Sequence, residues 1–312
     1  MPLLNFAHPC VSLYLLQTKL YRPMNIMPIH AGNFKLDGGA MHGVVPQSMW
    51  QKVNPPDANN MCSWSMRCLL VEIGNRLILI DNGMGDKQSE KFFGYYFLHG
   101  DHSLEKSLHA AGVDFGDITD VFLTHLHFDH CGGSIVRNGD GKLVPQFPKA
   151  QYWSNADHWQ WAVEPNAREK ASFLKENFMP IQESGQLNFV EFGGPSQPGG
   201  GQWAQDIFPG FSALRVDGHT DAMMIPHLDY KDKALVYMAD LLPSVGHIPL
   251  AWVMGYDTRP LITLQEKGDF LRNAADKEHV LFFEHDPINE CCTLKHTEKG
   301  VRLDEAFALS NL

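Results

Sequence analysis

The stretch FLTHLHFDHCGG, residues 122–133, constrains the fold more than any other part of this 312-residue sequence. It places three histidines and an aspartate within six positions, His125 to His130, at the end of a β-branched and aromatic run. Imidazole and carboxylate groups bind Zn²⁺ and other divalent first-row metals. One ion cannot easily take all four ligands from so short a segment. The cluster therefore indicates a metal site that other parts of the chain must complete.

Other predicted strands end close to potential ligands. Three of them do so within a residue or two: FSALRVDG (211–218) before His219, KALVYMAD (233–240) at Asp240 and HVLFFEHD (279–286) at His285. Loops at strand ends are where rigid sheets usually present functional groups. Two ions that share the cluster and these three side chains, with Asp240 between the ions, satisfy the ligand count. Metal binding lowers the pKa of bound water to about 7, which provides a nucleophile at neutral pH.

The remaining sequence alternates predicted strands and helices without a linker or a tandem repeat. CLLVEIGNRLILIDNG (68–83) is typical of a hairpin that turns at Gly74-Asn75. Helices are predicted over 102–112, 155–178 and 263–277, the second of them capped by Asn155 and divided at Pro165. Short strands are predicted over 118–125, 150–154 and 187–192, and a mobile loop over 193–201. We expect one domain over 24–312 and a flexible N-terminal extension over 1–23.

Composition and charge exclude some function classes. The formal net charge of −11 argues against nucleic acid as the main partner, because phosphate backbones require clustered lysine and arginine. No apolar run approaches the ~18 residues of a membrane span. The N-terminus lacks the charge order and cleavage site of a secretory signal, so a cytoplasmic protein without membrane contact is favoured. The six cysteines show no disulfide framework and are interpreted as reduced, mostly buried thiols.

The segment from His125 to His130 matches the HxHxDH signature and resembles the metallo-β-lactamase superfamily. VDGHT (216–220), YMAD (237–240) and FFEHD (282–286) look like the later ligand segments of that family, in family order. The resemblance implies an αβ/βα sandwich, an α/β fold in which two mixed β-sheets face each other with helices outside and metals at the rim. It also implies a ligand set: His125, His127 and His219 for one ion, Asp129, His130 and His285 for the other, and Asp240 as the bridge.

Two further segments resemble one branch of that superfamily. GNFKLDGGAMHGVVP (32–46) and ADLLPSVGHIPLAWVMGYD (239–257) look most like the quorum-quenching lactonases, YtnP-like proteins included, and their organophosphate-hydrolase relatives. The resemblance implies a small-molecule lactone or ester substrate, with N-acyl-homoserine lactones as one option. A metal-bridging hydroxide would attack the carbonyl, and Asp129 would return a proton to the leaving alkoxide. The chain departs from the branch at Leu242-Pro243-Ser244, where lactonases place a tyrosine shortly after the bridging aspartate.

Substrate contacts are predicted from residues near these motifs. His247 and Tyr256 are candidates for the missing group that polarises or protonates the substrate, and Phe92, Phe93, Trp252 and Met254 are candidates for holding an acyl chain. The aromatic run 92–97 as a whole fits a core segment or a dimer surface better than a substrate wall, so a homodimer stays open. Asp81 either orients a metal-bound histidine or caps the following turn. Cys131 is interpreted as a small buried thiol rather than a ligand.

Several functions stay open on the sequence. A glyoxalase II-like thioesterase would need cationic groups for the carboxylates of glutathione, and no Lys/Arg cluster lies near the motifs. A phosphotriesterase uses the same metal chemistry, whereas a non-catalytic metal-binding scaffold would retain the ligands without turnover. Zn²⁺ is the expected metal, and the His/Asp ligand set also accepts Fe²⁺, Mn²⁺ or Co²⁺.

Overall fold

The computed structural model describes residues 24–193 and 201–312. The predicted N-terminal extension and residues 194–200 of the predicted loop lie outside this part of the chain. In the described residues no helix is long and apolar enough to cross a bilayer. The five cysteines of this part, Cys62, Cys68, Cys131, Cys291 and Cys292, are free and buried, which confirms their interpretation as buried thiols.

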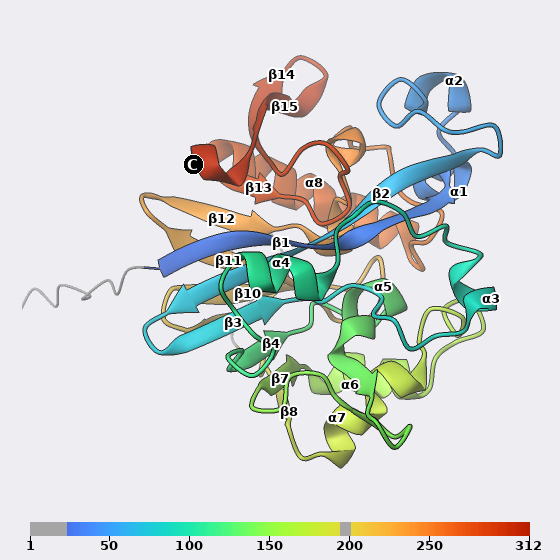
Figure 1. Cartoon of the computed structure of the whole chain (residues 1–312). Helices are drawn as coiled ribbons and strands as arrows, with labels where there is room; N and C mark the ends of the chain where they lie inside the picture. The colour runs from blue at the N-terminus through green and yellow to red at the C-terminus, as the bar shows by residue number, and fades with distance from the viewer. Residues whose placement is uncertain (1–23, 194–200) are drawn as a thin grey trace, which may run out of the picture.

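Two mixed sheets form the body of the molecule (Figure 1). The first sheet has the strand order β1-β2-β3-β4-β7-β8, with β1 (Met24–Asp37), β2 (Met61–Ile73), β3 (Arg76–Ile80), β4 (Asp120–Phe122), β7 (Gln151–Ser154) and β8 (Leu187–Phe189). The second has the order β15-β14-β13-β12-β11-β10-β9, with β9 (Gln202–Phe208), β10 (Phe211–Val216), β11 (Met223–Tyr230), β12 (Lys233–Tyr237), β13 (Val280–Phe282), β14 (Cys291–Thr297) and β15 (Gly300–Phe307). A small separate sheet pairs β5 (Ile135–Arg137) with β6 (Leu143–Pro145).

Helices lie outside the sheets (Figure 1). They are α1 (Gly38–His42), α2 (Gln47–Trp50), α3 (Glu90–Phe93), α4 (Leu104–Ala110), α5 (Phe128–Cys131), α6 (Ala156–Val163), α7 (Met179–Glu183) and α8 (Pro260–Asp276). Helix α4 packs on β1, and α8 packs on β14 and β15. One buried cluster joins side chains of both sheets, such as Leu69 and Ile80 of the first with Ile225 and Leu235 of the second. The predicted sandwich of facing mixed sheets is therefore confirmed.

Most predicted elements form where the sequence places them. Ile73 pairs with Arg76 across the hairpin turn, and Gly74 adopts a φ of 65°, a conformation that favours glycine. The helix predicted over 155–178 is wrong beyond α6. After Pro165 the Asn166 side chain accepts hydrogen bonds from the backbone N–H groups of Arg168 (2.8 Å) and Glu169 (3.1 Å), so it stabilises a turn. Within the rest of the predicted range the chain is helical only in a short 3₁₀ turn, Lys175–Asn177, and α7 begins just beyond that range.

The sheet topology positions the predicted ligands. Strands β4, β10, β12 and β13 end at Phe122, Val216, Tyr237 and Phe282, each three residues before His125, His219, Asp240 or His285. Strands β3 and β4 run parallel, as do β12 and β13. The carboxyl ends of parallel strands meet at one edge of a sheet, which is where α/β proteins commonly place their sites. Equivalent edges of the two sheets thus deliver four ligand-bearing segments.

Candidate metal centre

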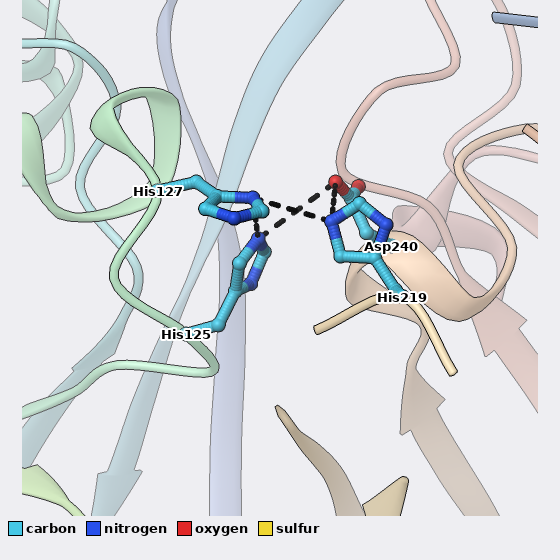
Figure 2. A group of neighbouring side chains, drawn as sticks. All are labelled: His125, His127, His219 and Asp240. Atoms are coloured by element: carbon cyan, nitrogen blue, oxygen red, sulfur yellow. Dashed lines mark hydrogen bonds and ion pairs between the residues drawn. The ribbon is translucent and has the colours of Figure 1, made fainter. Parts of the chain in front are cut away.

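The first group of converging side chains contains His125, His127, His219 and Asp240, and Figure 2 shows them pointing toward one another. His127 Nδ1 lies 3.1 Å from His125 Nε2 and 3.2 Å from His219 Nε2. Asp240 Oδ2 lies 3.1 Å from His219 Nε2. All four residues are buried. Three imidazole nitrogens and one carboxylate oxygen therefore surround a common point.

The second group contains Asp129, His130 and His285. His285 Nε2 lies 3.1 Å from His130 Nε2, and Asp129 Oδ2 lies 3.8 Å from His285 Nε2. Asp240 connects this group to the first, because its Oδ1 lies 3.1 Å from His285 Nε2 while its Oδ2 faces His219. Asp240 thus stands between two clusters of nitrogen and oxygen atoms.

These atoms fit divalent metal ions. Ligands about 2.0 Å from a tetrahedral Zn²⁺ ion lie about 3.3 Å from one another, close to the nitrogen separations within each group. Facing nitrogen lone pairs repel each other unless a proton or a cation lies between them. Asp240 Oδ1 is buried without a hydrogen bond of ordinary geometry, and a buried carboxylate requires a compensating positive charge. The donor set, its spacing and its charge therefore suit a pair of cations.

Each histidine of the two groups has a polar partner on its outer ring nitrogen. The partners are Thr124 Oγ1 for His125 (3.1 Å), Glu169 Oε1 for His127 (3.5 Å), Asp257 Oδ1 for His219 (2.9 Å), Ser65 O for His285 (2.8 Å), and Asp81 Oδ2 (3.1 Å) with Glu284 Oε2 (2.9 Å) for His130. Such contacts fix the tautomer and the orientation of a ligating imidazole. They leave one nitrogen of every ring facing the centre.

The carboxylates at the centre control the protonation of its histidines. Burial opposes protonation of His219, but Asp240 and Asp257 outweigh burial and raise the pKa of His219 to about 10. Burial also opposes protonation of His285, and Asp240 outweighs it and raises this pKa to about 9. Burial would raise the pKa of Asp240, yet the surrounding histidines hold it well below its usual range. Protons on His219 and His285 therefore balance Asp240 in the metal-free protein, and metal binding must displace them.

Asp81 resolves the alternatives that the sequence left open. Its side chain accepts hydrogen bonds from Thr124 N (2.8 Å) and Thr124 Oγ1 (2.7 Å) and faces His130, so it orients the motif instead of capping a turn. Its φ is 55°, and Ala239, directly before Asp240, has a φ of 41°. Non-glycine residues in this region cost about 1–3 kcal/mol each and cluster at functional sites.

The two glycines after the motif are required by close packing and not by a special backbone conformation. Gly132 has an ordinary φ of −61°. A Cβ on Gly132 would lie 2.1 Å from Met84 O, and a Cβ on Gly133 would lie 2.3 Å from Asn82 O. The motif segment therefore needs glycine because it packs directly against the backbone that follows β3.

A cavity of about 380 Å³ opens above the two groups. His127, Asp129, His219, Asp240 and His285 form its floor. Its wall combines Leu36 of β1, Met41 of α1 and Phe128 of α5 with the loop residues Tyr96, Arg168, Glu169, Ala171, Ser172, Met254, Gly255 and Tyr256. A concave, mainly apolar pocket with a few convergent polar groups is the usual form of a small-molecule site.

Comparison with known proteins assigns the family. The model of the metallo-beta-lactamase superfamily matches residues 67–285, which include every ligand candidate at the centre. The chain belongs to the metallo-β-lactamase superfamily. A search of curated proteins gave no match.

Solved structures of the superfamily share the whole fold. A probable metal-dependent hydrolase from Staphylococcus aureus is 25% identical, with a TM-score of 0.79 over 93% of this chain and 98% of that one. AidC, described as a dizinc quorum-quenching lactonase in complex with the product N-hexanoyl-L-homoserine, is 21% identical, with a TM-score of 0.72 over 91% and 95% of the two chains. An N-acyl homoserine lactone hydrolase with its product at the catalytic metal centre is 16% identical, with a TM-score of 0.60 over 84% and 93%. Family membership and these neighbours support the predicted metal-dependent hydrolase.

In this superfamily member only two of the six predicted substrate residues line the pocket, namely Met254 and Tyr256. His247 is buried behind the wall, where its ring stacks on His42 at 4.7 Å and its nitrogens bond Ser244 Oγ and Met41 O. Trp252 packs edge-on against His42. The prediction of pocket contacts for these two residues was wrong, because both support the wall from behind.

The aromatic residues of α3 have a similar supporting position. Phe92 packs edge-on against Phe128 at 5.3 Å and in a tilted arrangement against Tyr96 at 5.0 Å, and Phe93 packs on Phe92 at 5.7 Å. Neither Phe92 nor Phe93 lines the cavity, which corrects their predicted role. Tyr96 does line it and was missed, since nothing in the run 92–97 distinguishes the inward-facing ring.

Three carboxylates of the centre were also missed: Glu169, Asp257 and Glu284. Glu169 and Asp257 lie in loops without a recognisable motif, and only the folded chain brings them to His127 and His219. Glu284 carried a usable signal, because a carboxylate directly before a predicted ligand, at the end of the apolar run VLFF, is unusual for a buried strand end.

The loop over 253–257 serves both the floor and the wall. Met254 and Tyr256 line the pocket, whereas Asp257 bonds His219 and also accepts a hydrogen bond from Met254 N at 3.2 Å. The loop is tied to α1 by a hydrogen bond from Gly255 N to Ala40 O at 2.8 Å. Its position therefore affects substrate contacts and the orientation of His219 together.

Proposed function

We propose that this protein is a two-metal hydrolase that opens a lactone or a related carboxylic ester, with N-acyl-homoserine lactones as the leading substrates. One observation carries the proposal. Asp240 places one oxygen 3.1 Å from His219 and the other 3.1 Å from His285, at the floor of a cavity of about 380 Å³. This arrangement suits a carboxylate that bridges two ions beneath a small-molecule pocket.

The proposed ligands follow the two groups. His125, His127 and His219 would hold one ion, Asp129, His130 and His285 the other, and Asp240 both. When bound, the ions would supply an activated water and polarise the ester carbonyl. Zn²⁺ is our first choice, with Fe²⁺, Mn²⁺ and Co²⁺ as alternatives for the same donor set.

Asp129 is suited to proton transfer. Its side chain is 12% exposed and lines the cavity, so it can reach a bound substrate as well as the second group. A carboxyl group held beside the scissile bond can return a proton to the alkoxide that leaves when the ring opens. We assign that role to Asp129.

Two phenols replace the tyrosine that the sequence lacks after Asp240. Leu242 and Ser244 are fully buried and do not line the pocket. Tyr96 and Tyr256 line it from other loops. Burial, together with the Asp129 charge, raises the pKa of Tyr96 to about 12, and burial raises the pKa of Tyr256 as well. Both phenols therefore keep their protons at neutral pH and can donate to a substrate oxygen.

Apolar side chains on the wall suit an acyl chain. Leu36, Met41 and Met254 line the cavity beside Phe128. Contact with methylene groups would displace water from these side chains, at about 0.8 kcal/mol per buried methylene. The lactonase neighbours share this fold, and two of them are described with acyl-homoserine products, which supports the same substrate class for this chain.

The test is a substrate panel with the purified, zinc-loaded full chain. N-Acyl-homoserine lactones of different lengths, a glutathione thioester, an aryl ester and a phosphotriester would be compared by kcat/KM. Opening of the lactone ring would be monitored through the acid that it releases. We expect the highest kcat/KM for a lactone. Turnover of the thioester or the phosphotriester alone would redirect the assignment to those hydrolases, and no turnover of any substrate would favour a metal-binding scaffold.

A further inference from the structure

His130 differs from the other histidines of the centre in having two carboxylates at one ring nitrogen. Its Nδ1 lies 3.1 Å from Asp81 Oδ2 and 2.9 Å from Glu284 Oε2, and all three residues are fully buried. By comparison, His219 has the single carboxylate of Asp257. One N–H group provides one proton for hydrogen bonding, and one carboxylate is enough to accept it. The second carboxylate must therefore have another role.

Asp81 is already engaged by another part of the motif. Its Oδ1 accepts from Thr124 N at 2.8 Å, and its Oδ2 accepts from Thr124 Oγ1 at 2.7 Å. Neither oxygen of Glu284, in contrast, has a hydrogen bond of ordinary geometry to any residue in the described part of the chain. Glu284 therefore faces His130 and also the Tyr237 hydroxyl, whereas Asp81 holds the strand end at Thr124 in addition to the ring.

The segment 283–285 approaches His130 from two sides. Glu284 contacts the outer nitrogen, and the next residue, His285, faces the inner nitrogen with Nε2 to Nε2 at 3.1 Å. Hydrogen bonds to β2 hold this segment, from Arg67 N to Glu284 O (3.0 Å) and from Ser65 N to His285 O (3.1 Å). One short backbone segment thus sets the position of a ligand candidate and the position of the carboxylate behind its neighbour.

A cation among Asp81, His130 and Glu284 would also fit their spacing, since their ligand atoms lie within 4.8 Å of one another. Such an ion would require the Nδ1 lone pair of His130 while Nε2 faces the second group, which leaves the ring without any proton. A hydrogen bond from Nδ1–H to Asp81, with the Glu284 carboxylate 2.9 Å from the same nitrogen, keeps the ring neutral and directs Nε2 inward. The hydrogen-bonded arrangement is the simpler chemistry.

We propose that Glu284 is a positioning residue for the second metal group: its carboxylate, 2.9 Å from Nδ1 of His130, acts with Asp81 to keep the ring proton on that nitrogen, turns Nε2 toward Asp129 and His285, and strengthens cation binding there. The inference rests on the proposed two-metal function. Carboxylates behind a ligating histidine raise its basicity, and their removal typically weakens metal binding about 10- to 100-fold. Glu284 should therefore affect the second group and leave the first group, which has Asp257 and Glu169 behind its histidines, unchanged.

The test is a zinc titration of the metal-free full chain against a chromophoric chelator, with Glu284→Gln as the main variant. The wild-type chain should bind two ions, and the variant should bind one with unchanged affinity and the other about 10- to 100-fold more weakly. Glu72→Gln is the control for the loss of a carboxylate. Glu72 is an exposed residue of β2, so both affinities should persist in this variant.

A second readout reports on the ring itself. In zinc-loaded protein labelled with ¹⁵N-histidine, the Nδ1–H signal of His130 is identified by its loss in His130→Ala. This signal should shift in Glu284→Gln and stay in place in Glu72→Gln. If Glu284→Gln does not fold, Glu284→Asp replaces it, because the shorter side chain keeps the charge but withdraws the carboxylate from Nδ1.

The outcomes separate the two proposals. If the wild-type chain binds two ions and the Glu284 variant matches it in both affinities and in the Nδ1–H signal, the role of Glu284 is overturned and the proposed function stands. Equal weakening of both ions would also overturn it, since the effect would then be general. A third ion bound by the wild type and lost in the variant would replace it with a cation site. Failure of the wild type to bind two ions would overturn the proposed function and this inference with it.

Discussion

The floor of the pocket follows strand ends, whereas most of its wall residues lie in loops far apart in the chain. His125, His219, Asp240 and His285 each lie three residues beyond a strand, and all are buried. The wall residue Tyr256, in contrast, is 39% exposed and comes from an irregular loop. The sheets therefore fix the positions of the ligand candidates, whereas the loops can vary and determine which substrate reaches them.

The largest expected effect comes from the floor. Asp240→Asn removes the charge between the two groups, so we expect both metal occupancy and lactone turnover to fall, with kcat reduced at least about 10³-fold. Metal content and kcat of the purified variant are the measurements. Asp229→Asn, at an exposed position on β11, is the control and should match the wild type. Full activity of Asp240→Asn would remove the basis of the two-metal proposal.

A substitution in the wall should affect the reaction without affecting the metals. Tyr256→Phe removes a donor to the developing oxyanion, and we expect kcat to fall roughly 10²-fold with zinc content unchanged. Tyr95→Phe is the matched control, because Tyr95 adjoins the pocket residue Tyr96 in the sequence but is 61% exposed and does not line the pocket. Loss of zinc in Tyr256→Phe would contradict the separation of floor and wall.

Asp257 connects the two regions, because it bonds His219 of the floor and lies in the loop 253–257, which forms part of the wall. Asp257→Asn weakens the hydrogen bond to His219, so affinity for one ion should fall about 10- to 100-fold while the second ion is retained. A chelator-competition titration measures both affinities. An effect on KM as well would indicate that the loop 253–257 has moved, whereas unchanged zinc affinity would show that His219 does not need this partner.

The smallest effect is expected for an apolar wall residue. Met254→Ala shortens a side chain that lines the cavity, and we expect kcat/KM for long-chain lactones to fall about 10-fold, with short-chain lactones little changed. The ratio of kcat/KM for long and short acyl chains is the measurement. Met49→Ala, at a position that is 49% exposed, should leave this ratio unchanged. An equal loss for all chain lengths would place the acyl group elsewhere.

The sequence predicted the floor of the site well for a physical reason. The residue type shows which side chains can bind a metal, and β-branched and aromatic runs indicate where strands end. His125, Asp240 and His285 could therefore be located from local patterns alone. The seven predicted ligand candidates converge into two groups, and their roles as ligands stay predictions. The fold followed from the same segments, because their order and spacing match those of the superfamily.

The wall could not be predicted in the same way. Whether a ring lines the pocket or supports it depends on contacts between distant segments, such as Lys35 N with Tyr96 O at 2.7 Å. These contacts have no local signature, so Phe92 and Trp252 could not be distinguished from Tyr96 by composition. The helix wrongly predicted beyond Pro165 had a comparable cause, because one side chain, Asn166, hydrogen-bonds the backbone and brings Glu169 to His127.

The short distance along the chain between Tyr256 and Asp257 limits how new specificities can arise in this scaffold. An insertion in the loop 253–257 that enlarges the cavity would also shift the carboxylate that bonds His219, so an altered loop length would weaken the catalyst as it broadens the substrate range. Laboratory evolution toward bulkier substrates should therefore accept exchanges of side chains at Met254 and Tyr256 and reject changes in loop length.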